Sequence, residues 1–238
     1  MQYISIFSTI VALAFAVAVF NRFRQRGGLH LLFWTIGLVF YGLGTLTEVS
    51  MLFTFSPLAL KVWYISGAMM TAAWLGQGTI NLLVRKRGVA RGLNILLAVV
   101  SLAAILLVAL APVTPAAATF STGIPVSSQY KDILVRNGFI IALTILLNLY
   151  GTLTLIGGAI YSAFLFWRKK VLFNRLLGNI LIAAGAMFPA IGGSFLKAGM
   201  PDWLYLSEFL GAIVMYVGFV QATVAPATQP APAATPGD

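Results

Sequence analysis

The stretch ISIFSTIVALAFAVAVFNRFRQR, residues 4–26, shows the pattern that the whole chain repeats. Its part up to Phe20 is apolar and close to the length of about 20 helical residues that crosses the hydrocarbon core of a membrane. Arg22, Arg24 and Arg26 follow at once. No basic segment precedes the run and no A-x-A sequence closes it, so it predicts a retained transmembrane helix rather than a cleaved signal peptide.

Six further apolar runs follow and account for most of the chain. The composition is 60% hydrophobic and 8% charged, whereas a soluble domain carries roughly 25% charged residues. So few charges do not cover a water-facing surface, and we therefore predict an all-α polytopic membrane protein, a bundle of seven transmembrane helices. The predicted spans are residues 4–20, 29–52, 58–84, 93–111, 138–167, 176–196 and 203–223.

Two segments lie outside this pattern. Residues 112–137 form the longest predicted loop, with three prolines and many small residues, and we expect a protease to reach it. Residues 224–238 are rich in Pro and Ala and lack the apolar content for a core. The expected organisation is a transmembrane domain over residues 1–223 and a disordered cytoplasmic tail over residues 224–238.

Basic residues indicate the orientation. Of the fifteen, eleven flank the same ends of the spans and four lie at the opposite ends. Loops rich in Lys and Arg stay in the cytoplasm, so we expect an outer N-terminus and a cytoplasmic C-terminus, in a bacterial inner membrane. The net charge of +10 then reflects contact with anionic lipid headgroups rather than with nucleic acid. The eleven are Arg22, Arg24, Arg26, Arg85, Lys86, Arg87, Arg91, Arg168, Lys169, Lys170 and Arg175, and the four are Lys61, Lys131, Arg136 and Lys197.

Residues that the chain lacks exclude several classes of site. It has no cysteine, which removes disulfides and thiolate metal sites, and a single histidine, which removes bis-histidine haem ligation. The last predicted span has no lysine for a retinal Schiff base. We therefore expect no metal, no cofactor and no enzymatic activity.

Polar, aromatic and small residues recur at helical spacing along four predicted spans. Such stripes turn away from lipid, because lipid does not satisfy amides and small residues let helices approach closely. One interpretation is that the stripes are packing seams; the other is that bulky aromatics beside glycines leave a cavity for a ligand. The residues predicted to bind that ligand are Trp34, Tyr41, Glu48, Trp63, Trp74, Gln77, Asn148 and Glu208.

Glu48 and Glu208 are the most distinctive of these residues. Each lies in the outer third of an apolar run, and an ionised carboxylate at a helix centre costs roughly 2.5 kcal/mol or more in lipid. Lys61, Arg136 and Lys197 lie at outer helix ends, and we expect at least one of them to pair with the two acids. Two interpretations stay open, a structural ion pair and an outward-facing site for a cation, a proton or a polar ligand.

Three segments carry a family resemblance: NRFRQRGGLHLLFWTIGLVFYGLGTLTEV (21–49), KVWYISGAMMTAAWLGQGTINLLV (61–84) and YLSEFLGAIVMYVGFV (205–220). With its basic loop and its aromatic, glycine-punctuated helices, the chain resembles over about residues 3–223 the seven-helix N-terminal membrane region of some bacterial sensor histidine kinases. The resemblance implies ligand sensing. In those kinases the last helix leads into catalytic domains, whereas here a Pro/Ala-rich segment follows, and His30 is the only histidine, so no phospho-accepting histidine is present.

These features predict a non-enzymatic membrane sensor or ligand-binding module that acts through a separate partner, either a cytoplasmic signalling protein or another subunit of a membrane complex. Two alternatives remain. One is a small transporter or channel-like subunit with Glu48 and Glu208 on a polar path, and the other is an accessory subunit that binds lipid or pigment. A polar path to the cytoplasmic side would favour transport. A closed outer pocket would favour sensing, and an apolar groove that faces lipid would favour the accessory role.

The orientation leads to a first prediction. A reporter that is active only in the cytoplasm should work when fused after Asp238 and fail when fused before Met1, because eleven basic residues against four hold one set of loops inside. Reporter activity in whole cells measures this. An active N-terminal fusion would contradict either the number of spans or their orientation.

Overall fold

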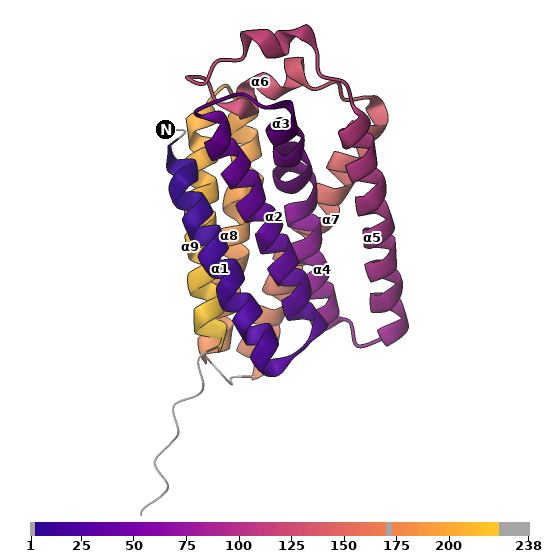
Figure 1. The fold of residues 1–238 in the computed structure, drawn as a ribbon. Coiled ribbons are helices and arrows are strands. Elements are labelled where there is room, and N and C mark those ends of the chain that lie inside the picture. The colour runs from indigo at the N-terminus through magenta and orange to yellow at the C-terminus, as the bar shows by residue number, and fades with distance from the viewer. Residues whose placement is uncertain (1–2, 170–172, 224–238) are drawn as a thin grey trace, which may run out of the picture.

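The computed structural model describes residues 3–169 and 173–223 of the chain, and these are helical throughout apart from short connections. Figure 1 shows the long helices standing side by side as a bundle. Seven helices among the described residues are long and apolar enough to cross a membrane. The prediction of an all-α, seven-helix polytopic membrane protein is therefore confirmed. The predicted tail, residues 224–238, lies outside the described residues.

Six of the spans form a closed ring. In order around the ring these are α1 (Ile4–Arg26), α2 (Leu29–Met51), α4 (Thr71–Leu83), α7 (Gly138–Lys169), α8 (Phe173–Lys197) and α9 (Pro201–Thr223), with α9 packed back on α1. The seventh, α5 (Arg87–Leu110), packs mainly on α4 and α7 and stands at the edge of the bundle (Figure 1). This arrangement leaves the centre of the ring as the place where side chains from all six helices meet.

The third span is not one regular helix, although the sequence predicts a single helix over residues 58–84. It consists of α3 (Pro57–Trp63), a π-helical segment η1 (Tyr64–Met70) and α4. Ser56 caps its start by accepting a hydrogen bond from the Ala59 N–H at 3.4 Å, with Pro57 in the first turn. Hydrophobic periodicity does not distinguish a wider helical turn from an ordinary one, so the sequence pattern contained no sign of η1.

Glycines set the closest helix contacts. A Cβ atom built on Gly151 of α7 would lie 2.1 Å from the Ala72 carbonyl carbon, and one built on Gly76 of α4 would lie 2.9 Å from the Gly151 carbonyl oxygen. The two backbones therefore touch where α4 crosses α7. Inside a membrane the hydrophobic effect does not drive helices together. Van der Waals packing at such close crossings stabilises the bundle instead.

A second glycine contact joins α8 and α9 along their length. Gly178 faces Gly218, Gly185 faces Gly211, and Gly192 faces Ser207, so the small residues recur every seven residues on α8 and at intervals of four and seven residues on α9. A repeat of seven keeps one seam of each helix facing its partner. Pro189 lies in this seam, where a Cβ on Gly211 would be 2.8 Å from its ring.

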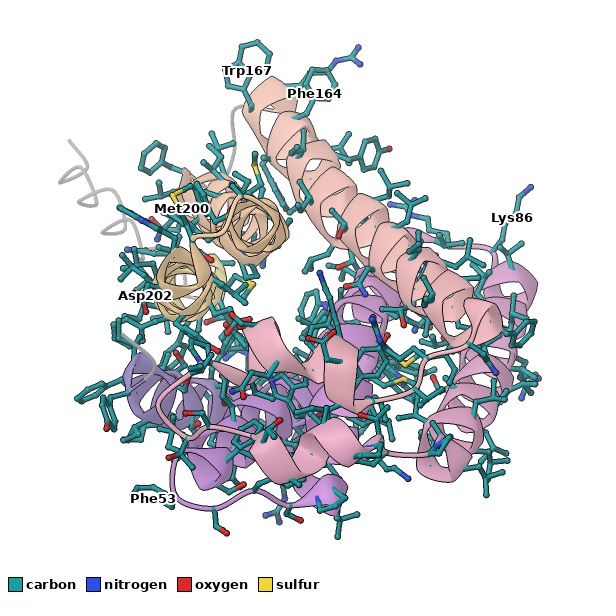
Figure 2. All side chains as sticks on the ribbon, turned by 90° about the horizontal axis from the view of Figure 1, so that it is seen from above. Phe53, Lys86, Phe164, Trp167, Met200 and Asp202 are labelled. Carbon is teal, nitrogen blue, oxygen red and sulfur yellow. The ribbon has the colours of Figure 1, made fainter. Side chains whose placement is uncertain are left out.

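The segment predicted as the longest loop is folded over one end of the bundle, as Figure 1 shows from the side and Figure 2 from above. It contains a 3₁₀ turn, η2 (Pro115–Thr119), and a helix, α6 (Val126–Ile133), and buries Val126 and Ile133 among other residues. The N–H of Val135 donates to the Pro112 carbonyl at 3.1 Å and closes the segment at its base. We call residues 112–137 the cap. The sequence contained no sign of the helix and turn in the cap, because its few apolar residues bury themselves against the bundle and not against each other.

The cap gives the bundle two distinguishable ends. The cap end also contains the start of α1, the end of α2 and the start of α9. The opposite end contains the basic residues in the last turns of α1, those that follow α4, and those at the end of α7. We call it the basic end. Arg22 there donates to the Thr223 carbonyl at 3.3 Å, so it joins the ends of α1 and α9.

The crossing of α4 and α7 generates the second prediction. Gly151→Ala should destabilise the folded protein by about 1–3 kcal/mol, because the added methyl group meets the backbone of α4 rather than a movable side chain. Thermal unfolding of the purified protein in detergent measures the effect. Gly157→Ala is the matched control, since it lies in the same helix and its Cβ would meet nothing within 4 Å. Equal unfolding temperatures for the two variants would contradict the close crossing.

Candidate ligand cavity

A cavity of about 180 Å³ lies at the centre of the ring, in the half of the bundle nearer the cap. Side chains from α2, α3, α4, α7, α8 and α9 line it, together with η1. Five of the residues that the sequence predicted as ligand-binding meet here, although they come from four separate spans. They are Tyr41, Glu48, Trp63, Asn148 and Glu208.

Close helix approach shapes the wall of this cavity. A Cβ built on Gly44 of α2 would lie 2.9 Å from the Gly67 Cα in η1, so the two helices touch there without side chains between them. Asn148 of α7 donates to the Ala68 carbonyl of η1 at 2.6 Å. The π-helical segment is therefore held from both sides at the level of the cavity. Single π-helical turns inside α-helices occur often at functional sites.

Glu48 is buried, with 4% of its surface exposed, and the protein itself supplies its partners. Ser5 of α1 donates to its Oε2 at 2.9 Å, and the Tyr205 side chain of α9 forms a further hydrogen bond with it. The Tyr205 hydroxyl also bonds the Ser127 hydroxyl of the cap at 3.0 Å. Ser5, Glu48, Tyr205 and Ser127 therefore form one buried chain from α1 through α2 and α9 to the cap.

Glu208 of α9 lines the same cavity as Glu48. Its backbone carbonyl accepts a hydrogen bond from the Tyr41 hydroxyl at 2.6 Å, and its half-buried carboxyl group lines the cavity. Its carboxyl group is close enough to that of Glu48 for the two to interact electrostatically. Two acidic groups thus share one enclosed space at membrane depth.

The expected ion pairs need correction at Lys61 and Arg136. The Lys61 ammonium donates to the Ala109 carbonyl at 2.7 Å, where it stabilises the carboxyl end of α5. The Arg136 guanidinium lies over the Tyr130 ring of the cap at 4.7 Å and over the Tyr64 ring at 5.9 Å. Both bases are therefore engaged by other partners, Lys61 by the end of α5 and Arg136 by two tyrosine rings. The Lys197 side chain lies outside the described part of the chain.

The remaining three predicted ligand residues do not reach this cavity. Trp34 donates to the Thr79 hydroxyl at 3.4 Å, and Trp74 donates to the Ser101 hydroxyl at 3.1 Å. Gln77 donates to the Asn94 side chain at 2.5 Å. Trp34 and Gln77 lie nearer the basic end than the cavity does. Trp74 lies at the level of the cavity-lining Ala72 and Leu75, but it faces Ser101 of α5 and not the cavity.

A layer of apolar side chains separates the cavity from the basic end. Leu75, Leu155 and Met215 form the cavity floor and also line a smaller space of about 30 Å³ beneath it. The other residues around that space are Phe15, Val19, Trp34, Leu38, Ile182 and Phe219. The Trp34 N–H is already bonded to Thr79, so no polar route leads through this layer among the described residues.

Sequence reasoning missed Ser5, Tyr205 and Ser127. Tyr205 precedes Glu208 by three residues, a spacing that places both on one face of α9, so helical periodicity contained its signal. Ser5 occupies the first turn of α1, at the same depth as the end of α2. Ser127 had no signal, because it lies in the segment predicted as the longest loop.

Comparison with protein-family models, with curated proteins and with solved structures finds no match for this chain. Among the described residues, no group of three His, Cys, Asp or Glu side chains is arranged to hold a metal ion. The site is therefore interpreted from its own chemistry.

The third prediction concerns the buried chain around Glu48. In a double-mutant cycle, Glu48→Gln and Tyr205→Phe should show a coupling energy between about 0.5 and 3 kcal/mol, because the two side chains share a buried hydrogen bond. Glu48→Gln and Lys61→Ala should show coupling near zero, since Lys61 binds Ala109 instead. Unfolding in detergent provides all of the free energies. The opposite ranking of the two couplings would restore the ion pair and contradict the chain.

Proposed function

We propose that this polytopic membrane protein is a non-enzymatic sensor that binds a small organic cation in the cavity between Glu48 and Glu208. In the proposed orientation the N-terminus is outside, so the cap and the cavity face the exterior of a bacterial cell. Binding of the cation would be signalled to a separate partner, either a signalling protein or another membrane subunit. The resemblance to the membrane region of sensor kinases supports this role, and the proposal itself depends on the cavity.

The observation that carries the proposal is a pair of carboxyl groups in one cavity with no basic partner among the described residues. An ionised carboxylate at membrane depth costs a few kcal/mol, and two that face each other cost more. A bound cation or a proton removes that cost. The site therefore favours positively charged occupants over neutral ones of the same shape.

The hydrogen-bond inventory of the cavity points to the same ligand class. The Asn148 amide donates to the carbonyls of Ala68 and Thr144, and the hydroxyl groups of Thr45 and Thr71 donate to backbone carbonyls of their own span. Because these protons are used within the protein, Asn148, Thr45 and Thr71 leave only lone pairs on oxygen for a ligand. A ligand that supplies N–H donors, such as an ammonium group, complements them.

The apolar part of the lining favours an organic cation over a bare ion. Trp63 and Tyr41 face the cavity beside Leu75 and Leu155. A cation over an aromatic face gains about 0.5–2 kcal/mol, and the aliphatic walls accept a hydrocarbon body. Polar residues fix the charged end, and apolar residues select the rest of the molecule.

Sensing is favoured over transport by the apolar floor of the cavity. A transporter of cations needs polar groups along the whole path, whereas Phe15, Leu38 and Phe219 are among the side chains that close the route to the basic end. The cap is joined to Glu48 through Tyr205 and Ser127. A ligand bound beside Glu48 would therefore be able to change the position of the cap.

The fourth prediction tests the charge of the ligand. Benzylammonium should stabilise the purified protein against thermal unfolding, and benzyl alcohol, which has nearly the same shape without the charge, should not. Glu208→Gln should abolish most of the effect, because it removes the cavity-facing carboxylate. Asp132→Asn is the matched control, since Asp132 is an exposed acid at the same end of the bundle. Calorimetric titration gives the affinities.

The same titration repeated at several pH values adds an independent check. Protons compete with the ammonium group for the carboxylates, so the affinity should rise as the pH rises and binding should release protons. Equal stabilisation by the amine and the alcohol, or by the amine in wild type and in Glu208→Gln, would contradict the proposed function.

A further inference from the structure

A second cavity, of about 690 Å³, lies at the basic end and is independent of the proposed sensor site. It is bounded by the start of α2, the end of α4 and the start of α5. Its polar lining consists of His30, Asn81, Arg91 and Asn94. Figure 1 shows that α5 stands apart from α2 at this end of the bundle.

The amide side chains at the inner wall of this cavity are already paired with each other. Asn94 Oδ1 accepts from Gln77 at 2.5 Å and from Asn81 at 2.8 Å, and Asn81 Oδ1 accepts from Asn94 at 3.1 Å. Tyr150 donates to Gln77 Oε1. All three side-chain carbonyl oxygens are therefore occupied.

What remains free at this wall is a set of donors. The Asn94 amide has two N–H groups, and one of them has no partner in the described structure. His30 and Arg91 make no hydrogen bond among the described residues, so their N–H groups are also available. This is the reverse of the cap-end cavity, where the lone pairs of acceptors remain. A ligand here has to bring acceptors.

Charge at this end supports an anion. All four acids of the described segments, Glu48, Asp132, Asp202 and Glu208, lie toward the cap. Around the second cavity the described charged residues are basic, with Arg85 and Lys86 in the connection from α4 to α5 beside Arg91. The field at this site therefore attracts anions from the membrane surface or from solution.

The rim adds an apolar requirement. Leu29 lines the cavity and is largely exposed, and Val84 and Ala90 complete the apolar part of the lining. Exposed leucine at the end of a membrane-length helix faces lipid chains. An occupant with an anionic head and hydrocarbon chains satisfies both the donors of the inner wall and this rim.

We propose that this cavity binds the phosphate group of an anionic phospholipid, with Arg91 as the principal cation and with His30 and Asn94 as additional donors. The site differs from general attraction between basic loops and a membrane surface, because a defined cavity and one arginine provide it. A lipid held there would brace the start of α5, a helix whose main contacts are with α4, η1 and α7.

Native mass spectrometry of the delipidated full chain in detergent tests the proposal. Added phosphatidylglycerol should remain bound where phosphatidylcholine does not. Arg91→Gln should lower phosphatidylglycerol occupancy about fivefold, the effect of one basic contact to an anionic lipid. Arg85→Gln is the matched control, an exposed base at the same end that does not line the cavity, and it should leave the occupancy nearly unchanged.

Each contrary result has a definite meaning. Equal losses in Arg91→Gln and Arg85→Gln would reduce the binding to diffuse surface attraction and overturn the site. Equal retention of the two lipids would overturn the requirement for an anion. Displacement of phosphatidylglycerol by the same concentration of glycerol phosphate would show that a soluble phosphate compound is the ligand, and would overturn the lipid assignment.

Discussion

Lipid offers no hydrogen bonds, so a carboxyl group at membrane depth depends wholly on the protein around it. Glu48 of α2 meets this condition through Ser5 of α1 and Tyr205 of α9, and Tyr205 passes the connection on to Ser127 of the cap. One buried acid therefore fixes three spans and the cap relative to each other. The ring closes where α9 meets α1, next to this chain of side chains. This chain therefore stabilises the closure of the ring and the position of the cap over it.

Glycine contacts decide how much space is left at the centre of that ring. Where Gly151 meets α4 and Gly185 meets α9, the helices approach until backbones touch. Where Gly44 meets Gly67, the partner is a π-helical segment whose wider turn moves the side chains of the third span. Close contact at some levels and a displaced turn at another leave a cavity instead of a filled core. Helix packing thus determines where the cavity lies, and Glu48 and Glu208 in its lining determine which ligands it favours.

The two cavities are chemical opposites, and the distribution of charge along the chain explains why. The described acids lie toward the cap, and most of the basic residues lie at the other end. Internal hydrogen bonds strengthen the contrast. Near the cap, amide and hydroxyl protons are used within the protein and oxygen lone pairs remain. Near the basic end, carbonyl oxygens are used and N–H groups remain. This contrast is the basis for the proposed cation near the cap and the proposed anion at the basic end.

The sequence by itself determined the fold class, the seven spans and the helix faces that turn inward, because solvation by lipid imposes length, low charge and periodicity on each span separately. It placed Tyr41, Glu48, Asn148 and Glu208 on such faces without deciding whether they meet. Depth along the bundle, and the direction in which a helix-end base points, depend on contacts between distant segments. Only the tertiary structure decided that Lys61 turns to α5 while Glu48 bonds Ser5, and that residues 112–137 fold as a cap. The physical reason is that a span's own residues fix its position across the membrane, whereas its neighbours fix its rotation and its partners.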